Sequence, residues 1–321
     1  MKDWKEIDIT EIEGFSIGSA EYPEAGTGCT VILADPAART GLDIRGGGPA
    51  SREAALLDPL ASNEAVNAVL LSGGSAFGLE ASLGVVSYLE ERGIGFPTEF
   101  GVVPIVCQSC LFDLSVGSSS VRPDKALGYQ ACVNAGNFRQ GNYGAGTGAT
   151  CGKFAGREHI MKSGLGAFAL QAGDLKVGAL IAANPFGEIV DFRTGTVLAG
   201  PHRGAPAGSY AELVVDDLVR YSINPFRENT AIGVILTNAD LSKAHLCKVA
   251  AMAHDGYARA IFPAHTMYDG DSIHAMTSGT AAADVTAVGI LAAYAMTEAI
   301  LNAARHADSA YGFASAKDSS R

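Results

Sequence analysis

Apolar residues follow two different patterns along this chain. Short apolar runs predict buried strands at residues 29–34, 66–71, 177–183, 188–192, 230–237 and 272–276. Longer amphipathic or largely apolar segments predict helices at residues 76–92, 123–133, 211–220, 242–259 and 284–304. Because the strands and helices are mixed throughout and no internal repeat is visible, the pattern predicts a layered α/β or α+β architecture.

Turn and cap residues mark the ends of several of these elements. Ser75 is suited to cap the helix that follows it, and Gly93 stands just beyond the end of that helix. Ser242 is suited to cap a second helix in the same way. The sequence Asn184-Pro-Phe-Gly187 is typical of a turn, so we expect the strands on either side of it to form a hairpin.

A change of composition separates the first two-thirds of the chain from the rest. Residues 199–209 are rich in Pro and Gly, and we expect a linker over about residues 199–229, interrupted by the short helix. An apolar strand then begins abruptly at Thr230. From its position alone, Thr230 is most simply a β-branched residue at the start of a strand.

Composition excludes several classes of protein. Hydrophobic residues make up 48% of the 321 residues and charged residues 18%, which argues against disorder. The formal net charge of −11 disfavours binding to nucleic acid. The first residues alternate in charge without an apolar run, and the longest apolar stretch is short for a bilayer, so we expect neither a signal peptide nor a membrane span. The six cysteines form no secreted framework, so we expect buried thiols and a cytoplasmic location.

The glycine-rich segment Gly144–Lys153 allows two interpretations. Its first half is similar to the glycine pattern of dinucleotide-binding sites, and it ends in Gly-Lys as a P-loop does. No buried strand precedes it, however, and Phe154 stands where a P-loop has Ser or Thr. An ordered structural loop is the simpler interpretation, with Lys153 available for a role in a buried site.

Histidines and aspartates gather before the last predicted strand. His254, His265, Asp269 and Asp271, with His274 in the strand itself, can all bind metals, although their spacing matches no standard zinc motif. On an extended segment, residues 269 and 271 place both carboxylates on one face, where like charges resist joint ionisation. An exposed turn and a metal-dependent hydrolase both stay open as interpretations.

Several segments, in the same order along the chain, resemble one family. They are Gly28–Leu33, Asp43–Gly47, Leu71–Leu79, Gly144–Lys153, Asn229–Ile232 and His265–Asp271. Together they are similar to the self-cleaving L-aminopeptidase/D-esterase family, which includes β-peptidyl aminopeptidases and the nylon-oligomer hydrolase. The resemblance extends from about Gly14 to Ala304, and Ser16–Ala20 and Asp124–Gly128 favour the nylon-oligomer hydrolase branch.

This resemblance implies a fold and a processing event. The fold is a four-layer αββα sandwich similar to N-terminal-nucleophile hydrolases, with residues 1–321 forming a single catalytic domain. The precursor cuts itself before a Ser or Thr, and the matching bond here joins Asn229 to Thr230. The products are residues 1–229 and 230–321, which the resemblance implies assemble as a homotetramer of cleaved protomers.

The resemblance also implies roles for individual residues. Thr230 is the nucleophile, and its new α-amine is the base that accepts the hydroxyl proton. Asp269 and Asp271 hold and polarise the amine and the hydroxyl, and Lys153 offsets their charge. Asn184 donates its amide to the tetrahedral oxyanion.

Two features depart from the family's pattern. Threonine stands where the classical aminopeptidases have serine, as in the nylon-hydrolase branch. Phe112 aligns with a tyrosine that relatives carry in the active site, so one hydroxyl donor is missing. We expect Phe112 and Gly146 to line the substrate pocket.

The sequence therefore predicts a self-processed N-terminal-threonine amidohydrolase that needs no cofactor or metal. Its substrates are small peptides, other amides or linear ω-amino-acid oligomers, cut through an acyl-enzyme. We expect no nucleic-acid or membrane partner. The alternative is a non-catalytic nucleotide-binding protein that uses the loop Gly144–Lys153.

Overall fold

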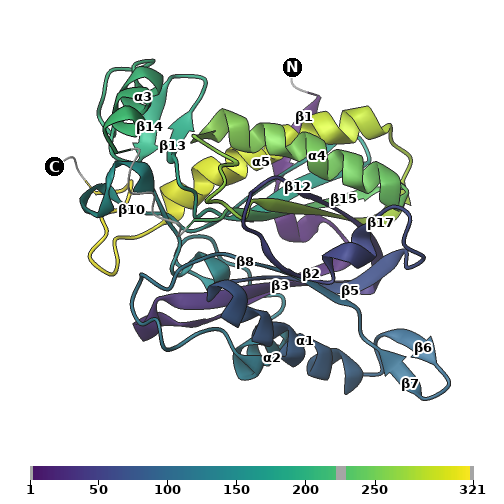
Figure 1. The fold of residues 1–321 in the computed structure, drawn as a ribbon. Helices are drawn as coiled ribbons and strands as arrows, with labels where there is room; N and C mark the ends of the chain where they lie inside the picture. The colour runs from purple at the N-terminus through teal and green to yellow at the C-terminus, as the bar shows by residue number, and fades with distance from the viewer. Residues whose placement is uncertain (1–2, 222–228, 319–321) are drawn as a thin grey trace.

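Two sheet layers lie face to face between two pairs of helices (Figure 1). The computed structural model describes residues 3–221 and 229–318. Helices α4 (Lys243–Ala260) and α5 (Val285–His306) cover one layer, and helices α1 (Ala81–Glu90) and α2 (Lys125–Val133) cover the other. The expected αββα sandwich of the α+β class is confirmed.

The strand order explains how the two layers are joined. One layer has the order β1-β11-β12-β15-β17 and continues into β3; in the other, β2 and β5 flank β3, followed by β8 and β4. The strands are β1 (Trp4–Ile7), β2 (Phe15–Tyr22), β3 (Thr27–Ile44), β4 (Ala50–Arg52), β5 (Ala65–Ser72), β8 (Val106–Cys110), β11 (Leu165–Ala172), β12 (Leu175–Ala182), β15 (Ile232–Ala239) and β17 (Ser272–Ala281).

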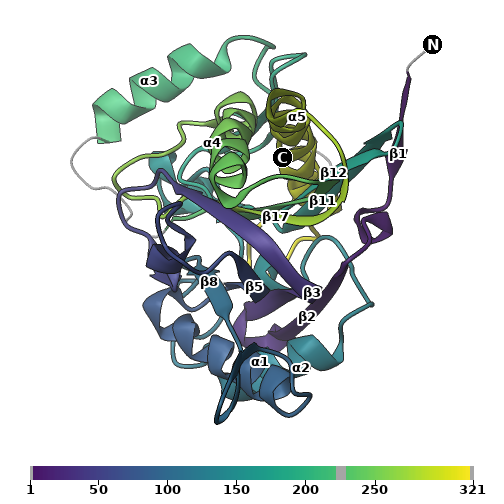
Figure 2. The same ribbon diagram turned by 90° about the vertical axis from the view of Figure 1, so that its right-hand side faces the viewer.

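Strand β3 belongs to both layers. Its first part pairs with β2 and β5, so that Cys29 lies opposite Ser72, and its last part pairs with β17, so that Ile44 lies opposite Ser272. A register shift between residues 33 and 38 separates the two parts. The long strand that crosses Figure 2 is β3, and it carries the chain from one layer to the other.

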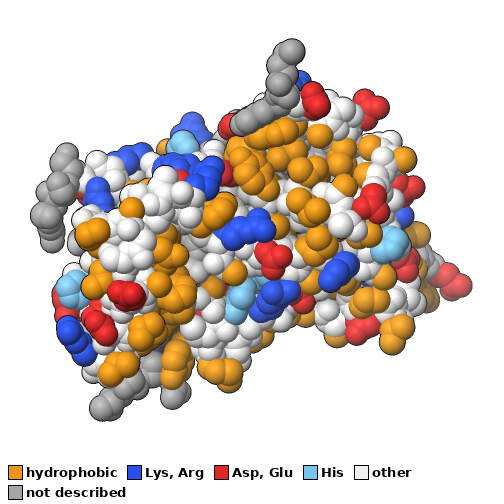
Figure 3. Space-filling view, turned by 90° about the horizontal axis from the view of Figure 1, so that it is seen from above, with side chains coloured by type: hydrophobic (Ala, Val, Ile, Leu, Met, Phe, Trp, Pro, Cys, Tyr) orange, Lys and Arg blue, Asp and Glu red, His pale blue; other side chains and the backbone are white. Residues whose placement is uncertain are grey.

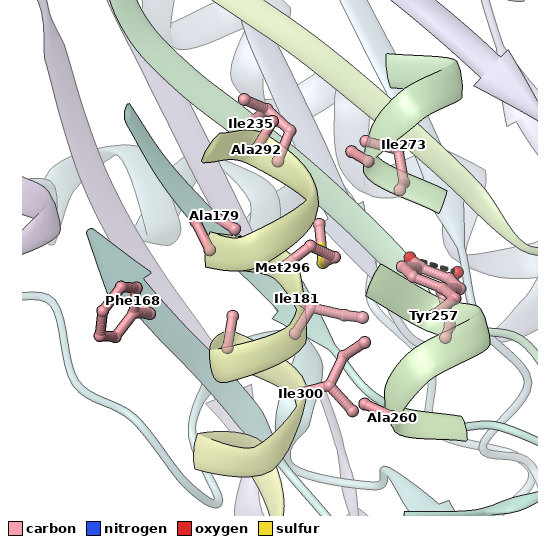
Figure 4. Packing of buried hydrophobic residues seen from close by; sticks show 14 of the residues in the cluster. Phe168, Ala179, Ile181, Ile235, Tyr257, Ala260, Ile273, Ala292, Met296 and Ile300 are labelled. Carbon is pink, nitrogen blue, oxygen red and sulfur yellow. Dashed lines mark hydrogen bonds between the residues drawn. The ribbon is translucent and has the colours of Figure 1, made fainter. Parts of the chain in front are cut away.

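Buried hydrophobic residues fill the three spaces between the layers. Figure 4 shows the cluster in which α4 and α5 pack on the sheet, with Tyr257 and Met296 facing Ile181. Neighbouring residues of β15 belong to different clusters, since Ile235 faces the helices and Val234 faces the second sheet layer. Burial on both faces explains why β15 is a continuous apolar run rather than an alternating one. Each fully buried aliphatic side chain contributes about 1.5–3 kcal/mol.

Smaller elements lie around this sandwich. A three-stranded sheet contains β13 (Glu188–Asp191), β14 (Thr196–Ala199) and β16 (Ile261–Phe262), and two-stranded pairs are formed by β9 (Thr150–Cys151) with β10 (Met161–Lys162) and β6 (Phe96–Thr98) with β7 (Gly101–Val103). Helix α3 is Tyr210–Tyr221. The 3₁₀ helices are η1 (Ile9–Glu11), η2 (Pro23–Ala25), η3 (Ala54–Leu57), η4 (Ser75–Glu80), η5 (Gly144–Gly146), η6 (Lys153–Ala155) and η7 (Arg157–His159).

Most of the predicted elements are confirmed. Ser242 caps α4 by accepting a hydrogen bond from the backbone of His245, and Asp284 caps α5. Gly93 follows α1 with φ of +68°, as a residue that ends a helix often does. The strand predicted at 29–34 is the first part of the longer β3, and β15 begins two residues later than predicted.

Two local predictions are wrong. Ser75 does not cap a helix: it lies inside η4 with φ of +53°, while Gly74 precedes it and α1 begins only at Ala81. The strands before and after Asn184-Pro-Phe-Gly187 do not form a hairpin either. Strand β12 pairs with β11 and β15, whereas β13 pairs with β14 and β16, so this segment crosses between two sheets.

The predicted linker is partly structured. Helix α3 packs on the body of the protein, where Val214 is buried in a cluster with Phe154 and Phe186. Asp217 of the same helix pairs with His202 at 3.2 Å. Residues 222–228 of the predicted linker lie outside the described residues.

Helix α5 is long and apolar enough to cross a membrane by length and composition alone. However, 72% of its most apolar window is buried inside the protein, and the helix packs on α4 and on strands β11 and β12. This is the environment of a core helix. The face of the molecule in Figure 3 mixes charged side chains of both signs with hydrophobic ones.

Candidate active site

Three strand ends meet around Thr230. Strands β15 and β17 are parallel, so Thr230, just before β15, lies beside Asp271, just before β17. Strand β12 runs antiparallel to β15, so Asn184, just after β12, reaches the same edge. The sheet topology therefore brings together residues that are far apart in the sequence.

Thr230 is only 4% exposed, and both of its polar atoms are held by backbone groups. Its Oγ1 accepts a hydrogen bond from the backbone N–H of Gly270 at 3.0 Å and donates one to the carbonyl oxygen of Asn229. Its backbone N–H donates to the carbonyl oxygen of Asn184 at 2.9 Å. The hydroxyl thus lies directly beside the carbonyl of the bond that the sequence predicts to be cut.

Asp271 holds the residue that follows Thr230. Its Oδ1 accepts a hydrogen bond from the backbone N–H of Ala231 at 2.8 Å, and its Oδ2 accepts from Nδ1 of His265 at 2.8 Å. The carbonyl oxygen of Ala231 accepts from the hydroxyl of Tyr257 at 3.1 Å. Both peptide groups of Ala231, the first of which it shares with Thr230, are therefore held by hydrogen bonds.

Asp269 accepts hydrogen bonds from neighbouring backbone and side-chain donors. Its carboxylate accepts hydrogen bonds from the backbone N–H of Phe186 and from both the backbone and the hydroxyl of Thr266, at 2.6–3.2 Å. Burial, and then the nearby charge of Asp271, raises the pKa of Asp269 above its ordinary value. Gly270, whose N–H donates to Thr230, follows Asp269 directly in the chain.

Glycine is required between the two aspartates. A Cβ at Gly270 would lie 2.8 Å from Oγ1 of Thr230 and 2.9 Å from the carbonyl oxygen of Gly48. The sequence reasoning missed this residue, although its place between two predicted site residues was a usable signal.

Lys153 and Asn184 form the opposite side of the site. The ammonium of Lys153, 2% exposed, donates to the side-chain oxygen of Asn184 at 2.7 Å and to its carbonyl oxygen at 3.1 Å. Lys153 is placed by the backbone, because its N–H and that of Gly152 donate to the carbonyls of Phe186 and Gly187. Gly152 has φ of +76°, a conformation that suits glycine.

The amide of Asn184 is oriented by two other segments. Its oxygen accepts from the backbone N–H of Thr150 at 3.0 Å, and its nitrogen donates to the carbonyl oxygen of Phe112 at 2.8 Å. One of the two amide N–H bonds is thus used in this uncut chain.

Asp113 supports the Phe112 segment from behind. Its carboxylate accepts from the hydroxyl of Thr27 and from the backbone N–H of Gly74, both at 2.7 Å. Burial raises the pKa of Asp113 to about 6, although the hydrogen bonds and the charge of Lys153 oppose the shift. No local pattern in the sequence predicts Asp113, because its partners Thr27 and Gly74 come from two distant segments.

A cavity of about 400 Å³ opens beside Thr230. The described residues that line it are Gly48, Ala50, Ser75, Cys110, Phe112, Asn229, Thr230, Met267 and Tyr268. Phe112 therefore lies where the sequence predicts. Gly146 does not line this cavity, which corrects its placement: it packs against Leu165, and its carbonyl accepts from Lys162 at 3.1 Å.

The structure does not support a phosphate-binding role for the loop Gly144–Lys153. All of its residues are buried, and the N–H of Gly144 donates to the carboxylate of Glu21 rather than facing a cavity. Lys153 turns toward Asn184, and the element that begins there is a 3₁₀ turn of three residues instead of a helix.

The histidines do not form a metal centre with the aspartates. Within residues 3–221 and 229–318, no group of three or more His, Cys, Asp or Glu side chains is arranged to hold a metal ion. The ring of His265 instead packs on the rings of His254 and Tyr257, with centroids 4.7 and 5.4 Å away. All six cysteines are free thiols, and only Cys247 is not buried.

Comparison with known proteins gives the family and the fold. Residues 8–317 match peptidase family S58. A protein of Mycobacterium tuberculosis named as an uncharacterized aminopeptidase is 38% identical, over 97% of both chains. A 6-aminohexanoate-oligomer endohydrolase from an Agromyces strain is 34% identical, over 92% of this chain and 85% of its own.

Solved structures share the architecture at lower identity. The L-aminopeptidase D-Ala-esterase/amidase of Ochrobactrum anthropi, described as a variant of the Ntn hydrolase fold, matches with a TM-score of 0.71 at 17% identity, over 97% of this chain and 90% of that one. A Burkholderia β-aminopeptidase matches with a TM-score of 0.68 at 20% identity, over 93% and 86%. The chain therefore has this variant of the Ntn-hydrolase fold.

Proposed function

This chain belongs to peptidase family S58 and is an amide-bond hydrolase, and from that premise we propose that it cuts itself before Thr230 and then uses Thr230 as its nucleophile. One observation carries the proposal. The Thr230 hydroxyl lies against the carbonyl of Asn229 while the N–H of Gly270 donates to it, at the edge where three strands end. A residue that merely begins a strand has no need of this arrangement.

The self-cleavage is an acyl shift followed by hydrolysis. The Thr230 oxygen attacks the carbonyl carbon of Asn229, the bond from that carbon to the Thr230 nitrogen breaks, and the hydroxyl proton ends on the departing nitrogen. Water then hydrolyses the resulting ester, which releases the Asn229 carboxylate and restores the hydroxyl. The hydrogen bond from Gly270 favours negative charge on the attacking oxygen.

After the cut, the nitrogen of Thr230 is an α-amine. Such an amine has a pKa of about 7.7–8.0 in a model peptide, so it can accept the hydroxyl proton near neutral pH. The carbonyl oxygen of Asn184, 2.9 Å from this nitrogen in the uncut chain, accepts a hydrogen bond from one of its N–H groups, which turns the lone pair away from Asn184. The amine thereby becomes the base for turnover of other amides.

The amide side chain of Asn184 is the proposed donor to the tetrahedral oxyanion. Lys153 holds the amide oxygen, which directs the nitrogen to the opposite side, and the carbonyl of Phe112 uses only one of its N–H bonds. Removal of one such donor typically costs a factor of 10²–10³ in turnover. Asp269 and Asp271 keep Gly270 and Ala231 in place around the nucleophile.

The proposed substrates are small peptides, other amides or linear ω-amino-acid oligomers. None of the described residues that line the 400 Å³ cavity is charged, and Phe112, Met267 and Tyr268 give it an apolar wall. A short aliphatic acyl chain suits such a wall better than an ionised one. One relative is named as an aminopeptidase and another as an oligomer endohydrolase, which is consistent with peptide substrates and with oligomer substrates. We also propose a homotetramer of cleaved protomers in the cytoplasm, where free thiols persist.

The test is amide hydrolysis by the purified protein and by Thr230→Ala. Alanine p-nitroanilide and a linear 6-aminohexanoate trimer serve as the two probes. We expect release of product from at least one probe by the wild type, no release by the variant, and no effect of a chelator. Equal activity of the variant, or loss of activity with chelator, would overturn the proposal.

A further inference from the structure

His265 is the part of the site that the proposed mechanism does not use. It comes six residues before Asp271 and adopts φ of +57°, a left-handed conformation that few residues other than glycine accept. In this conformation both its backbone N–H, at 3.1 Å, and its ring Nδ1, at 2.8 Å, reach Oδ2 of Asp271. Backbone strain of this kind is retained where the surrounding structure requires it.

The ring of His265 is held on its other sides by helix α4. It stacks on Tyr257 and meets His254 edge to face. Its Nε2 is buried and has no hydrogen-bond partner among the described residues. Since a buried N–H without a partner is costly, this environment favours a proton on Nδ1, which donates to Asp271, over one on Nε2.

Two routes lead from this ring to the nucleophile. Through Asp271 it reaches the N–H of Ala231, and through stacking on Tyr257 it reaches the carbonyl oxygen of the same residue. Ala231 follows Thr230 directly, so a rotation of the Asp271 carboxylate moves the peptide that carries the nucleophile.

We propose that His265 is a positioning residue that fixes the Asp271 carboxylate, and through it Thr230, in the geometry needed for cleavage. The inference rests on the proposed self-cleavage. In this proposal His265 acts through the hydrogen bond that its Nδ1 proton makes to Asp271, and not through the packing of its ring.

The surroundings of His265 decide what a pH profile will show. Three elements place titratable or charged groups near His265. Its own loop contributes Asp269 and Asp271, and α4 contributes His254 and Tyr257. Asp43 and Arg45, at the end of β3, interact with His254. Burial lowers the pKa of His254 and raises that of Tyr257, so both stay uncharged near neutral pH. Loss of the Nδ1 donor removes a hydrogen bond to Asp271, and hydrogen bonds of this kind favour the ionised form of a carboxylate.

Two variants separate the donor from the ring. His265→Phe keeps a flat ring against Tyr257 and loses the donor. His265→Asn loses the ring, tolerates the left-handed backbone, and can place an amide N–H near the position of Nδ1. The precursor is made by cell-free translation, and its self-cleavage is followed by intact mass between pH 4.5 and 9.

We expect the Phe variant to cleave itself about 10- to 100-fold more slowly than the wild type. The acid limb of its rate profile should lie about one pH unit higher. The Asn variant should restore most of the rate. A Phe variant with wild-type rate and acid limb would overturn the role of His265 alone. A slow Phe variant with an unmoved limb and no rescue by Asn would also overturn it, because packing alone explains that result. A wild-type chain that is never cut would instead contradict the proposed function.

A spectroscopic measurement covers a Phe variant that does not fold. In the uncut Thr230→Ala protein with ¹⁵N-labelled histidine, we expect a slowly exchanging Nδ1 proton signal that disappears in Thr230→Ala with His265→Asn. Absence of that signal from the folded parent would overturn the proposal.

Discussion

The two sides of Thr230 are built in different ways. The acidic side consists of Asp269, Gly270 and Asp271, which are contiguous in the sequence. The amide side consists of Lys153, Asn184 and Phe112, which come from three distant segments. On both sides a backbone group touches Thr230, the N–H of Gly270 on one and the carbonyl of Asn184 on the other. The ammonium of Lys153 holds the Asn184 carbonyl, and the carboxylate of Asp269 holds the backbone N–H groups of Phe186 and Thr266 near Gly270.

The residues that contact Thr230 directly differ from the charged residues that hold the surrounding groups in place. In the uncut chain the carboxylates of Asp269 and Asp271 bind backbone N–H groups around Thr230, and the ammonium of Lys153 binds Asn184. We therefore propose that the charged residues act mainly by positioning. The direct contacts with Thr230 come from the N–H of Gly270 and from the carbonyl groups of Asn229 and Asn184.

The most severe test of the acidic side is Gly270→Ala. The new Cβ would stand 2.8 Å from Oγ1 of Thr230, so the turn must shift and its N–H leaves the hydroxyl. We expect self-cleavage to slow by about 10²–10³-fold, the cost of losing one such donor. Gel analysis of the two pieces over time gives the rate, and a thermal melt shows whether the fold is retained. A folded variant that cleaves at the normal rate would remove Gly270 from the account.

The corresponding change on the amide side is Lys153→Met, which keeps most of the side-chain volume and removes the ammonium. Asn184 then loses a charged donor from each of its oxygens, and we expect turnover of an amide substrate to fall about 10- to 100-fold. Lys176→Met is the control, because Lys176 binds Glu11 and Glu13 away from Thr230. Equal losses in the two variants would contradict the assigned role.

The pH dependence of stability tests the role of Asp113, which lies next to Phe112 on the amide side. The pKa of Asp113 is raised by burial from 3.8 to about 6, so between these values the folded chain keeps a proton that the unfolded chain has lost. The unfolding free energy that Asp113 contributes therefore falls as pH rises through this window, by about 3 kcal/mol.

Asp113→Asn should remove that dependence, since its amide can still pair with Gly74 and Thr27. Urea unfolding at pH 4.5 and pH 7 measures the effect: we expect the wild type to lose more stability than the variant between the two. Parallel losses would show that Asp113 does not titrate in this window.

The smallest effect is expected for Phe112→Tyr. The backbone carbonyl that holds Asn184 is unchanged, so self-cleavage should keep its rate. The added hydroxyl changes only the wall of the cavity, and we expect less than a tenfold change in kcat/KM, with a different ranking of amide substrates. A large fall in self-cleavage would show that Phe112 acts on the nucleophile as well as on the pocket.

Most of the fold could be predicted from the sequence, because apolar runs and helix caps are local signals. Ser242 caps the beginning of α4 and Gly93 follows the end of α1, as such residues do. The predicted hairpin at Asn184–Gly187 was wrong because turn residues do not determine which sheet the next strand joins. The predicted helix cap at Ser75 was wrong for a related reason, since the N–H of Ser75 donates to the carbonyl of Leu111, which lies far away in the sequence.

The site was predictable only where its residues are contiguous or match a family motif. The spacing of Asp269 and Asp271 marked them as candidates, whereas Thr230 was selected only through the resemblance to the family, since its position alone favoured an ordinary strand residue. Asp113 and the link from His265 to Asp271 depend on tertiary contacts and positive φ that no local pattern encodes. Gly146 was misplaced because a buried glycine loop has the same sequence signature whether or not it faces a cavity.

The most direct test of the central claim is the intact mass of the purified chain beside Thr230→Ala and Thr230→Ser. We expect two pieces, residues 1–229 and 230–321, for the wild type and for the Ser variant, which keeps a hydroxyl. We expect one uncut chain for the Ala variant. A wild-type chain that stays whole over days, or an Ala variant cut at the same bond, would contradict it.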